Sequence, residues 1–199
     1  MARRNKHSLD EIKEMVLAAA ETIIVNEGSS ALTARRIAMD IGYTVGSIYM
    51  VFDSMADLIT HINAATVDNL SGQMQQVPDC APEQHITELA KTYVAFAGRN
   101  FNRWSMIFIR DNEPPEWYRQ KIKQIFSLVD AQFARLAPNG PAQQNRLAAN
   151  ALWSGIHGIC SLSLSRDQDA TAIKEVEDAV VLLAKNFIDG WVGSLHREN

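Results

Sequence analysis

The stretch from Thr33 to Leu58 constrains the fold more than any other part of the chain, because it is patterned as two short helices with a tight turn between them. Thr33 is placed to cap the first helix, whose apolar residues recur at i, i+3, i+4 and i+7. Gly42 follows where a helix end tolerates positive φ, and Thr44 is placed to cap the second helix. This arrangement is typical of a helix-turn-helix, in which the second helix can enter the major groove of DNA.

This stretch also resembles the TetR family of transcriptional regulators. The matching elements are Leu32-Thr33, Ile37-Ala38, Gly42, Gly46-Ser47-Ile48-Tyr49, Phe52 and Asp57-Leu58. The resemblance implies that the first three helices form a DNA-binding domain and that Thr33, Thr44 and Tyr49 contact DNA. It also implies a C-terminal domain that usually binds a small molecule, and binding changes the spacing of the two DNA-reading heads in a dimer.

The rest of the chain is patterned for helices, so we expect an all-α protein. Ser8 begins a first helix with a capping box to Glu11, and Gly28 ends that helix. Ser54, with Asp57 three residues later, offers a cap to the fourth helix. Beyond it we expect helices over 55–71, 83–98, 104–109, 116–137, 142–164 and 170–196. The predicted domains are a helix-turn-helix DNA-binding domain over 1–53 and an effector-binding and dimerisation domain over 54–199.

Composition removes several classes of function. With 47% apolar residues the chain can bury a core without disulfides or a structural metal, and 19 basic against 23 acidic residues argue against a non-specific nucleic-acid coat. Cys80 and Cys160 show no metal spacing, which is typical of free thiols in a reducing cytosol. No membrane span, cofactor motif, metal site or catalytic constellation is visible. We therefore expect a cytoplasmic protein that is not an enzyme.

The predicted DNA contacts come from both helices of the motif. In a recognition helix the first turn faces base edges, and residues near the ends face phosphates. The candidates are Thr33, Arg35, Arg36, Thr44, Val45, Gly46, Ser47, Tyr49 and Met50. Other interpretations stay open: Tyr49 packing in the core, Arg35 and Arg36 on a solvated face, and the basic residues 1–7 as a solubilising tail or a phosphate-contacting arm.

The motif departs from the family in its charge. Family members often carry basic residues at the positions of Val45 and Met50, a histidine at Val51 and a lysine at Met55. Residues 1–62 hold six basic and eight acidic side chains, a net charge of −2. Since phosphate contacts supply much of the affinity of DNA-binding proteins, we expect modest affinity. Val45 and Met50 can still read DNA shape or thymine methyl groups.

The last two predicted helices are the candidates for a homodimer surface. The expected interface residues are Gly155, Gly158, Val180, Leu183 and Phe187. The run from Trp153 to Gly158 resembles the Trp-x-x-x-His-Gly signature of one subgroup of TetR-type C-terminal domains. His157 within it is more often a packed core histidine than a ligand.

Aromatic residues of the middle of the chain are the candidates for an effector pocket, against the alternative that they are ordinary core. They are Phe101, Trp104, Phe108, Trp117 and Phe126. The function predicted from these features is a dimeric, sequence-specific regulator of transcription. It would bind palindromic double-stranded DNA as a repressor, and an unknown small-molecule effector would release it. The alternative is an all-α protein that senses a ligand or partner and has weakened or lost specific DNA binding.

Overall fold

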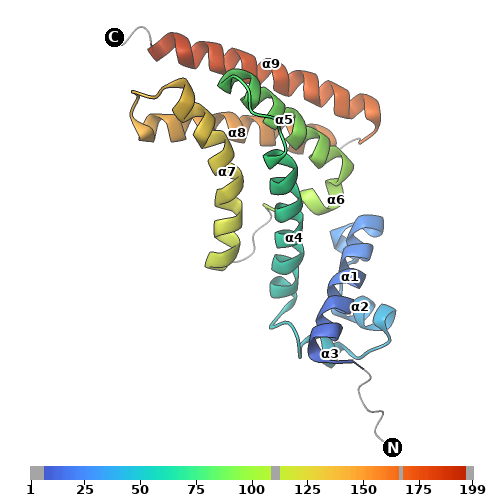
Figure 1. Cartoon of the computed structure of the whole chain (residues 1–199). Helices are drawn as coiled ribbons and strands as arrows, with labels where there is room; N and C mark the ends of the chain where they lie inside the picture. The colour runs from blue at the N-terminus through green and yellow to red at the C-terminus, as the bar shows by residue number, and fades with distance from the viewer. Residues whose placement is uncertain (1–6, 109–112, 166–167, 196–199) are drawn as a thin grey trace, which may run out of the picture. The chain divides into compact units, whose positions relative to one another are not determined.

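The computed structural model describes residues 7–108, 113–165 and 168–195, which form helices and connecting turns with no strand among them. The all-α prediction is confirmed. The helices are α1 (Leu9–Glu27), α2 (Ala34–Ile41), α3 (Val45–Ile48), α4 (Met55–Gln75), α5 (Pro82–Arg99), α6 (Phe101–Trp104), α7 (Glu116–Leu136), α8 (Ala142–Leu164) and α9 (Ala170–Leu195), with a short 3₁₀ helix over Ser29–Ala31 (Figure 1). No helix in the described part of the chain is long and apolar enough to cross a membrane.

The chain divides into two compact units. Unit 1 comprises Met1–Thr66 and Asn102–Tyr118, and unit 2 comprises Val67–Phe101 and Arg119–Asn199. These units reflect packing and do not test where the DNA-binding part ends, so the predicted limit between residues 53 and 54 stays a prediction. Residues 1–6 of the basic segment over 1–7, the end of the predicted helix at residue 109 and the last residues from 196 lie outside the described residues.

Unit 1 is built around one apolar cluster to which α1, α2, α3 and α4 contribute. The capping box of α1 is present: Glu11 N–H donates to Ser8 Oγ at 3.2 Å, and Ser8 N–H donates to the Glu11 carboxylate at 2.6 Å. The buried side chains come from α1 to α4 and from one later residue; they are Ile12, Val16, Ala20, Ile23, Ile24, Ile37, Ala38, Ile48, Phe52, Leu58, Ile62 and Met106. Leu9, the first residue of α1, is 52% exposed and lies outside this cluster.

The predicted helix over 104–109 is wrong. Helix α6 occupies Phe101–Trp104 and a turn follows it. The apolar residues of this run are buried but do not form a helix: Trp104, Met106 and Ile107 are all nearly inaccessible to solvent. The turn's carbonyls are bonded by side chains of unit 1: Asn63 Nδ2 donates to Met106 O at 3.0 Å, and the Tyr118 hydroxyl donates to Ile107 O at 3.1 Å. These bonds satisfy carbonyls that a helix would otherwise pair along its own backbone.

Unit 2 is held by long helices that approach closely. Helices α5, α8 and α9 pack side by side (Figure 1). A Cβ added at Gly98 of α5 would lie 2.6 Å from Ile173 of α9, and one at Gly155 of α8 would lie 2.9 Å from Leu183 of α9. Any larger residue at either glycine would force the facing side chain to move. Helix α4 ends at Gln75 and not at the predicted position 71, because a single interior glycine such as Gly72 weakens a helix without ending it.

Candidate nucleic-acid interface

The framework of the interface is a set of caps that the local sequence dictates. Arg36 N–H donates to Thr33 Oγ1 at 3.2 Å at the start of α2, and Ser47 N–H donates to Thr44 Oγ1 at 3.3 Å at the start of α3. Gly42 adopts φ 72° and ψ 31° between the helices, the left-handed conformation that glycine accepts without strain. The two helices therefore begin and turn where the pattern predicts.

The cap of α4 is also present, but the second bond of its capping box comes from the N–H of Asp53 and not from that of Ser54. Asp57 N–H donates to Ser54 Oγ at 3.1 Å, and the Asp57 carboxylate accepts from the N–H of Asp53, again at 3.1 Å. Helix α3 itself is a single turn. Backbone bonds from Tyr49 to Val45 and from Met50 to Gly46 continue its winding into the following turn. Tyr49 and Met50 therefore stand just beyond the helix and not within it.

Most of the predicted DNA-contacting side chains face solvent. Val45 is 39% exposed, Tyr49 47% and Met50 60%, whereas their neighbour Ile48 is fully buried. Thr33, Arg35, Thr44 and Gly46 are also exposed; Arg36 and Ser47 are half-buried. The structure thus brings the α3 candidates onto one accessible surface, which has an apolar character.

Arg36 is engaged within its own chain. Its guanidinium donates to both carboxylate oxygens of Asp40 at 3.2 Å and to those of Glu27 at 2.9 and 3.3 Å. The hydrogen bonds and charge of Asp40, followed by those of Glu27, raise the pKa of Arg36. Within the described part of the chain Arg35 makes no hydrogen bond or ion pair, so it is the cation of α2 available to a phosphate.

Two further contacts near the motif have no signal in the sequence. The hydroxyl of Tyr43, in the turn between α2 and α3, lies 2.7 Å from His7 Nδ1 in a hydrogen bond. This contact holds His7, the last residue of the basic segment over 1–7, against the turn of the motif. The ammonium of Lys13 lies 5.3 Å from the centre of the Phe52 ring, so part of its charge faces an aromatic side chain.

His61 of α4 connects the motif to the start of α7 within unit 1. Its ring lies 5.5 Å from that of Phe52 and 5.2 Å from that of Trp117. Burial, followed by the charge of Lys13, lowers the pKa of His61, and the charge of Asp57 opposes this shift. Sequence reasoning missed this residue because its neighbours are distant in the chain.

The five aromatic effector candidates do not form one cluster within either unit. Trp104, Phe108 and Trp117 belong to unit 1, whereas Phe101 and Phe126 belong to unit 2. Trp104 is buried, and Trp117 is 39% exposed.

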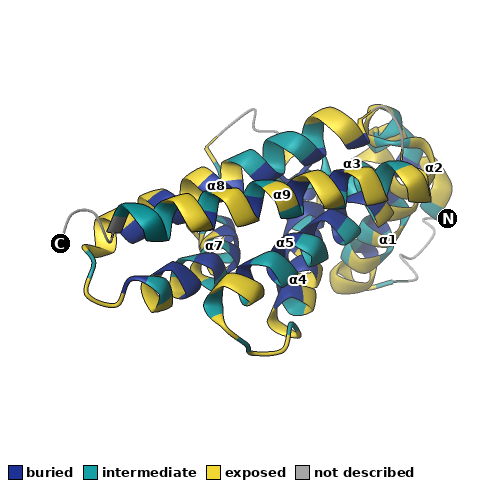
Figure 2. Cartoon of the chain, turned by 90° about the horizontal axis from the view of Figure 1, so that it is seen from above, coloured by how far each residue is buried: buried dark blue, intermediate teal, exposed yellow. Residues whose placement is uncertain are grey.

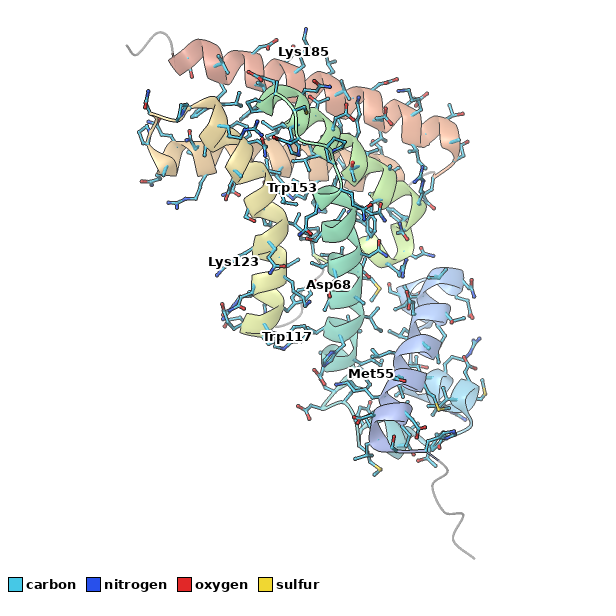
Figure 3. The ribbon with its side chains drawn as sticks, viewed as in Figure 1. Met55, Asp68, Trp117, Lys123, Trp153 and Lys185 are labelled. Carbon is cyan, nitrogen blue, oxygen red and sulfur yellow. The ribbon has the colours of Figure 1, made fainter. Side chains whose placement is uncertain are left out.

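Unit 2 contains a different aromatic group, around Trp153 of α8. Its ring centre lies 4.5 Å from that of Tyr93 and 5.5 Å from that of Phe126 (Trp153 is labelled in Figure 3). The Tyr93 hydroxyl lies 2.8 Å from His157 Nδ1, and the Ser161 hydroxyl 3.3 Å from His157 Nε2. Burial lowers the pKa of His157. His157 is thus a packed, hydrogen-bonded histidine, as the sequence favoured.

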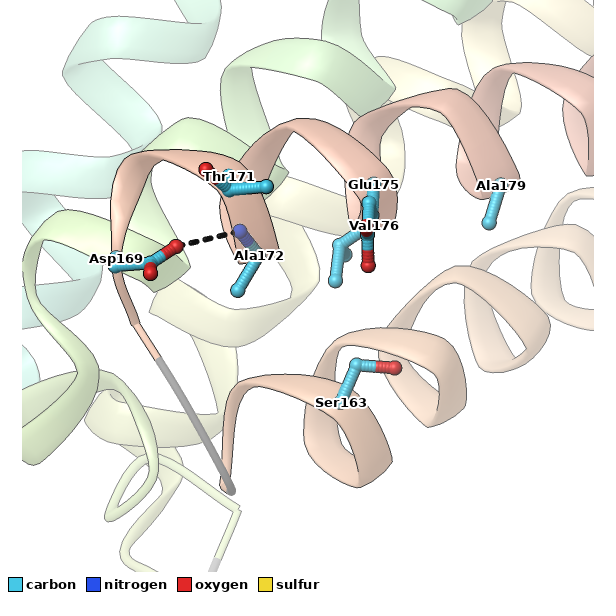
Figure 4. A pocket seen from close by; sticks show the side chains of 7 residues that line it. All are labelled: Ser163, Asp169, Thr171, Ala172, Glu175, Val176 and Ala179. Carbon is cyan, nitrogen blue, oxygen red and sulfur yellow. Dashed lines mark hydrogen bonds between the residues drawn. The ribbon is translucent and has the colours of Figure 1, made fainter.

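Among the described residues of unit 2, two hollows can be outlined, and none of the predicted effector residues lines them. One, of about 390 Å³, lies between the end of α8 and the start of α9, where Asp169 Oδ1 accepts from Ala172 N–H at 2.8 Å (Figure 4). The other, of about 400 Å³, lies where α7 and α8 meet and includes Asp130 and Asn145. Among the described residues no group of three His, Cys, Asp or Glu side chains is arranged to hold a metal ion.

The predicted dimer residues differ in what they face. Val180 is fully buried inside its own unit, and Gly155 packs on Leu183 of the same chain. Phe187 is half-buried, with its ring 6.2 Å from that of Phe133. A Cβ at Gly158 would meet nothing within 4 Å. The outward sides of α8 and α9 are exposed over much of their length (Figure 2).

A capped two-helix motif with an accessible second helix, followed by a separate helical unit, defines a helix-turn-helix DNA-binding protein. Two family descriptions match the chain: "Bacterial regulatory proteins, tetR family" over residues 16–62 and "Tetracyclin repressor-like, C-terminal domain" over residues 86–183. The chain belongs to the TetR family and is a transcriptional regulator with an N-terminal helix-turn-helix and a C-terminal helical domain. No curated protein sequence matches it.

Solved structures show the same fold at low sequence identity. A protein of unknown function from Rhodococcus sp. RHA1 has a TM-score of 0.72 at 19% identity, over 96% of this chain and 98% of the other. A protein from Mesorhizobium loti, titled a putative TetR-family transcriptional regulator, has a TM-score of 0.67 at 15% identity, over 92% of this chain and 98% of the other. The regulator FadR from Bacillus subtilis, in complex with stearoyl-CoA, has 0.65 at 15% identity, over 86% and 96%.

Proposed function

We propose that this regulator is a homodimeric repressor that binds palindromic double-stranded DNA and is released by a small molecule. The observation that carries the proposal is the exposure of Val45, Tyr49 and Met50 beside a buried Ile48, which leaves α3 one accessible side. The test is selection from random-sequence duplexes by the purified protein near physiological salt. Enrichment of an inverted repeat with half-sites about one helical turn apart supports a dimeric reader.

Individual roles follow from exposure and chemistry. The Tyr49 hydroxyl and Arg35 bind phosphates, and Thr33 and Thr44 orient their helices. Removing a phosphate contact weakens binding to all sequences and lowers the salt slope by about one unit. Arg35→Ala should therefore lower that slope, with Arg35→Lys as the control that keeps the charge. If a Tyr49→Phe protein binds its operator with unchanged affinity, the Tyr49 hydroxyl does not bind a phosphate.

The dimer surface is the exposed side of α8 together with the neighbouring side of α9. Three leucines there are largely accessible: Leu147 and Leu162 of α8, at 69% and 73%, and Leu182 of α9, at 61%. Gly158 lies at helical spacing between the two α8 leucines and allows a close approach. Gly158→Leu and Leu162→Glu should each shift the protein towards monomer in sedimentation experiments, with Gly190→Ala as a control on α9. A stable dimer in both variants would place the interface elsewhere.

The effector binds in the C-terminal domain. The predicted residues Phe101, Trp104, Phe108, Trp117 and Phe126 remain candidates, and the aromatic group around Trp153 adds Tyr93 and His157. We also propose that the Trp153-x-x-x-His157-Gly158 signature places this C-terminal domain in the Trp-x-x-x-His-Gly subgroup of TetR-type domains. Since a regulator of the same fold is described with stearoyl-CoA, long-chain acyl-CoA thioesters are the first compounds to screen for release from the selected DNA.

A second candidate function is a ligand or partner sensor with weakened DNA binding. The internal ion pairs of Arg36 favour it, because they withdraw one of the few cations of the motif from phosphates. A steep fall of affinity with salt and a preference for one palindrome distinguish the repressor from this alternative.

A further inference from the structure

The residues of the recognition helix lack the groups that read guanine and adenine. Arg or Lys pairs with guanine in the major groove, Asn or Gln with adenine, and Asp or Glu accepts from cytosine. From Thr44 to Val51 the chain carries none of these side chains. Thymine differs from the other bases in offering a methyl group, which apolar side chains recognise.

The polar atoms of this segment are partly committed elsewhere. Thr44 Oγ1 accepts from Ser47 N–H, and the two hydroxyls lie 3.0 Å apart in a hydrogen bond with each other. Tyr49, at 47% exposure, carries the hydroxyl that we assign to a phosphate. The other large side chains of this segment that project to solvent are apolar: Val45 at 39% exposure and Met50 at 60%. Exposed apolar side chains at the start of α3 and just beyond its end have few favourable contacts in a major groove apart from methyl groups.

The neighbouring helix does not supply the missing groups. In helix-turn-helix geometry the first helix crosses the DNA backbone, so a phosphate is the partner expected for Arg35 of α2. Arg36 is held by Glu27 and Asp40. Sequence discrimination by the two-helix motif therefore depends on α3.

We propose that Val45 and Met50 read thymine 5-methyl groups, so that the bases of each half-site facing α3 are A·T pairs with the thymine methyl towards the protein. This inference rests on the proposed DNA-binding function. It names the base composition that the function selects, and it makes Val45 and Met50 its specificity-determining residues.

The test replaces single thymines of the selected duplex by uracil, which removes the methyl group and keeps base pairing. Each contacted thymine should lose affinity by about fourfold, the effect of burying one methyl-sized group. Binding is measured by fluorescence anisotropy with the full chain at fixed salt. In a Val45→Ala protein the affinity should already be lower, and uracil at the position that Val45 reads should cause no further loss, which is the coupling expected of a direct contact.

Controls separate this inference from the function on which it rests. Val25→Ala changes a valine of α1 with 49% exposure outside the motif, and it should leave both affinity and the response to uracil unchanged. Thymine recognition is contradicted if an enriched palindrome binds equally well with uracil at every thymine position, or if it has G·C pairs opposite α3. Either result would still agree with the proposed repressor function. Absence of any enriched sequence, with the protein folded and free of ligand, overturns both.

Discussion

The two units of the molecule hold their helices in place by different means. In unit 1 the starts of α1, α2, α3 and α4 are fixed by side-chain caps, from Ser8, Thr33, Thr44 and Ser54. Unit 2 uses long helices whose sides fit closely, as at Gly98 against Ile173. A cap is local in sequence, whereas a close fit joins residues that are far apart. The difference predicts that unit 1 is sensitive to loss of single hydroxyls and unit 2 to added volume.

The largest effect is expected from filling the contact at Gly98. Gly98→Ala places a methyl group 2.6 Å from Cδ1 and Cγ1 of Ile173, which must move. Overpacking of this kind costs about 1–3 kcal/mol, more than alanine gains over glycine within a helix. Urea unfolding monitored by circular dichroism should show a lower midpoint with an unchanged slope.

The matched control is Gly72→Ala in α4 of the same unit. Nothing lies within 4 Å of a Cβ at Gly72, so the substitution should stabilise by up to about 1 kcal/mol through helix propensity. If both variants shift the midpoint in the same direction, close packing at Gly98 does not hold α5 against α9.

The next effect is expected in unit 1, from loss of the α3 cap. Thr44→Ala removes the acceptor for Ser47 N–H and the partner of its hydroxyl. Loss of such a cap costs about 1 kcal/mol. Thr44→Ser keeps the hydroxyl and should unfold close to wild type. Equal losses in the two variants would show that the threonine methyl, and not the cap, stabilises this turn.

The same contrast explains which parts of the structure the sequence predicts. The ends of α2, the turn at Gly42 and the start of α4 follow from residues within four positions of each other. Hydrophobic periodicity likewise predicts α8 over Ala142–Leu164, because a long helix repeats its signal many times. Of the predicted DNA contacts, Val45, Tyr49 and Met50 are accessible in the structure; their contact with DNA stays a prediction.

The features that the sequence does not predict depend on distant partners. Arg36 and Asp40 have the i, i+4 spacing of a helical ion pair, so the sequence indicates that contact. The second partner of Arg36, Glu27, lies on another helix, and the sequence does not indicate it. The bond between His7 and Tyr43 spans 36 positions. The apolar run over 105–108 predicts a helix, but these residues form a turn. The side chains that bond the carbonyls of this turn come from elsewhere in the chain, so the sequence pattern does not indicate them.

The smallest effect compares one histidine from each unit. Burial is the main cause that lowers the pKa of both His61 and His157 below the usual value of 6.5. Between the lowered folded-state pKa and the unfolded-state value, the unfolded chain binds a proton that the folded chain does not. The free energy of unfolding is therefore complete above about pH 6.5 and falls as the pH drops through this window.

Substituting each histidine separates the two contributions. His61→Gln and His157→Gln should each reduce the loss of stability between about pH 7.5 and about pH 5.5, because glutamine does not titrate. The remaining titratable groups change stability in all three proteins alike, so the difference in urea midpoint between the two pH values is the readout. His157 has Tyr93 and Ser161 as hydrogen-bond partners, whereas His61 faces Asp57, whose charge opposes the shift. The larger change is expected for His157, because the charge of Asp57 opposes part of the shift at His61. A larger change for His61 would mean that burial and the charge of Lys13 together affect His61 more than burial affects His157.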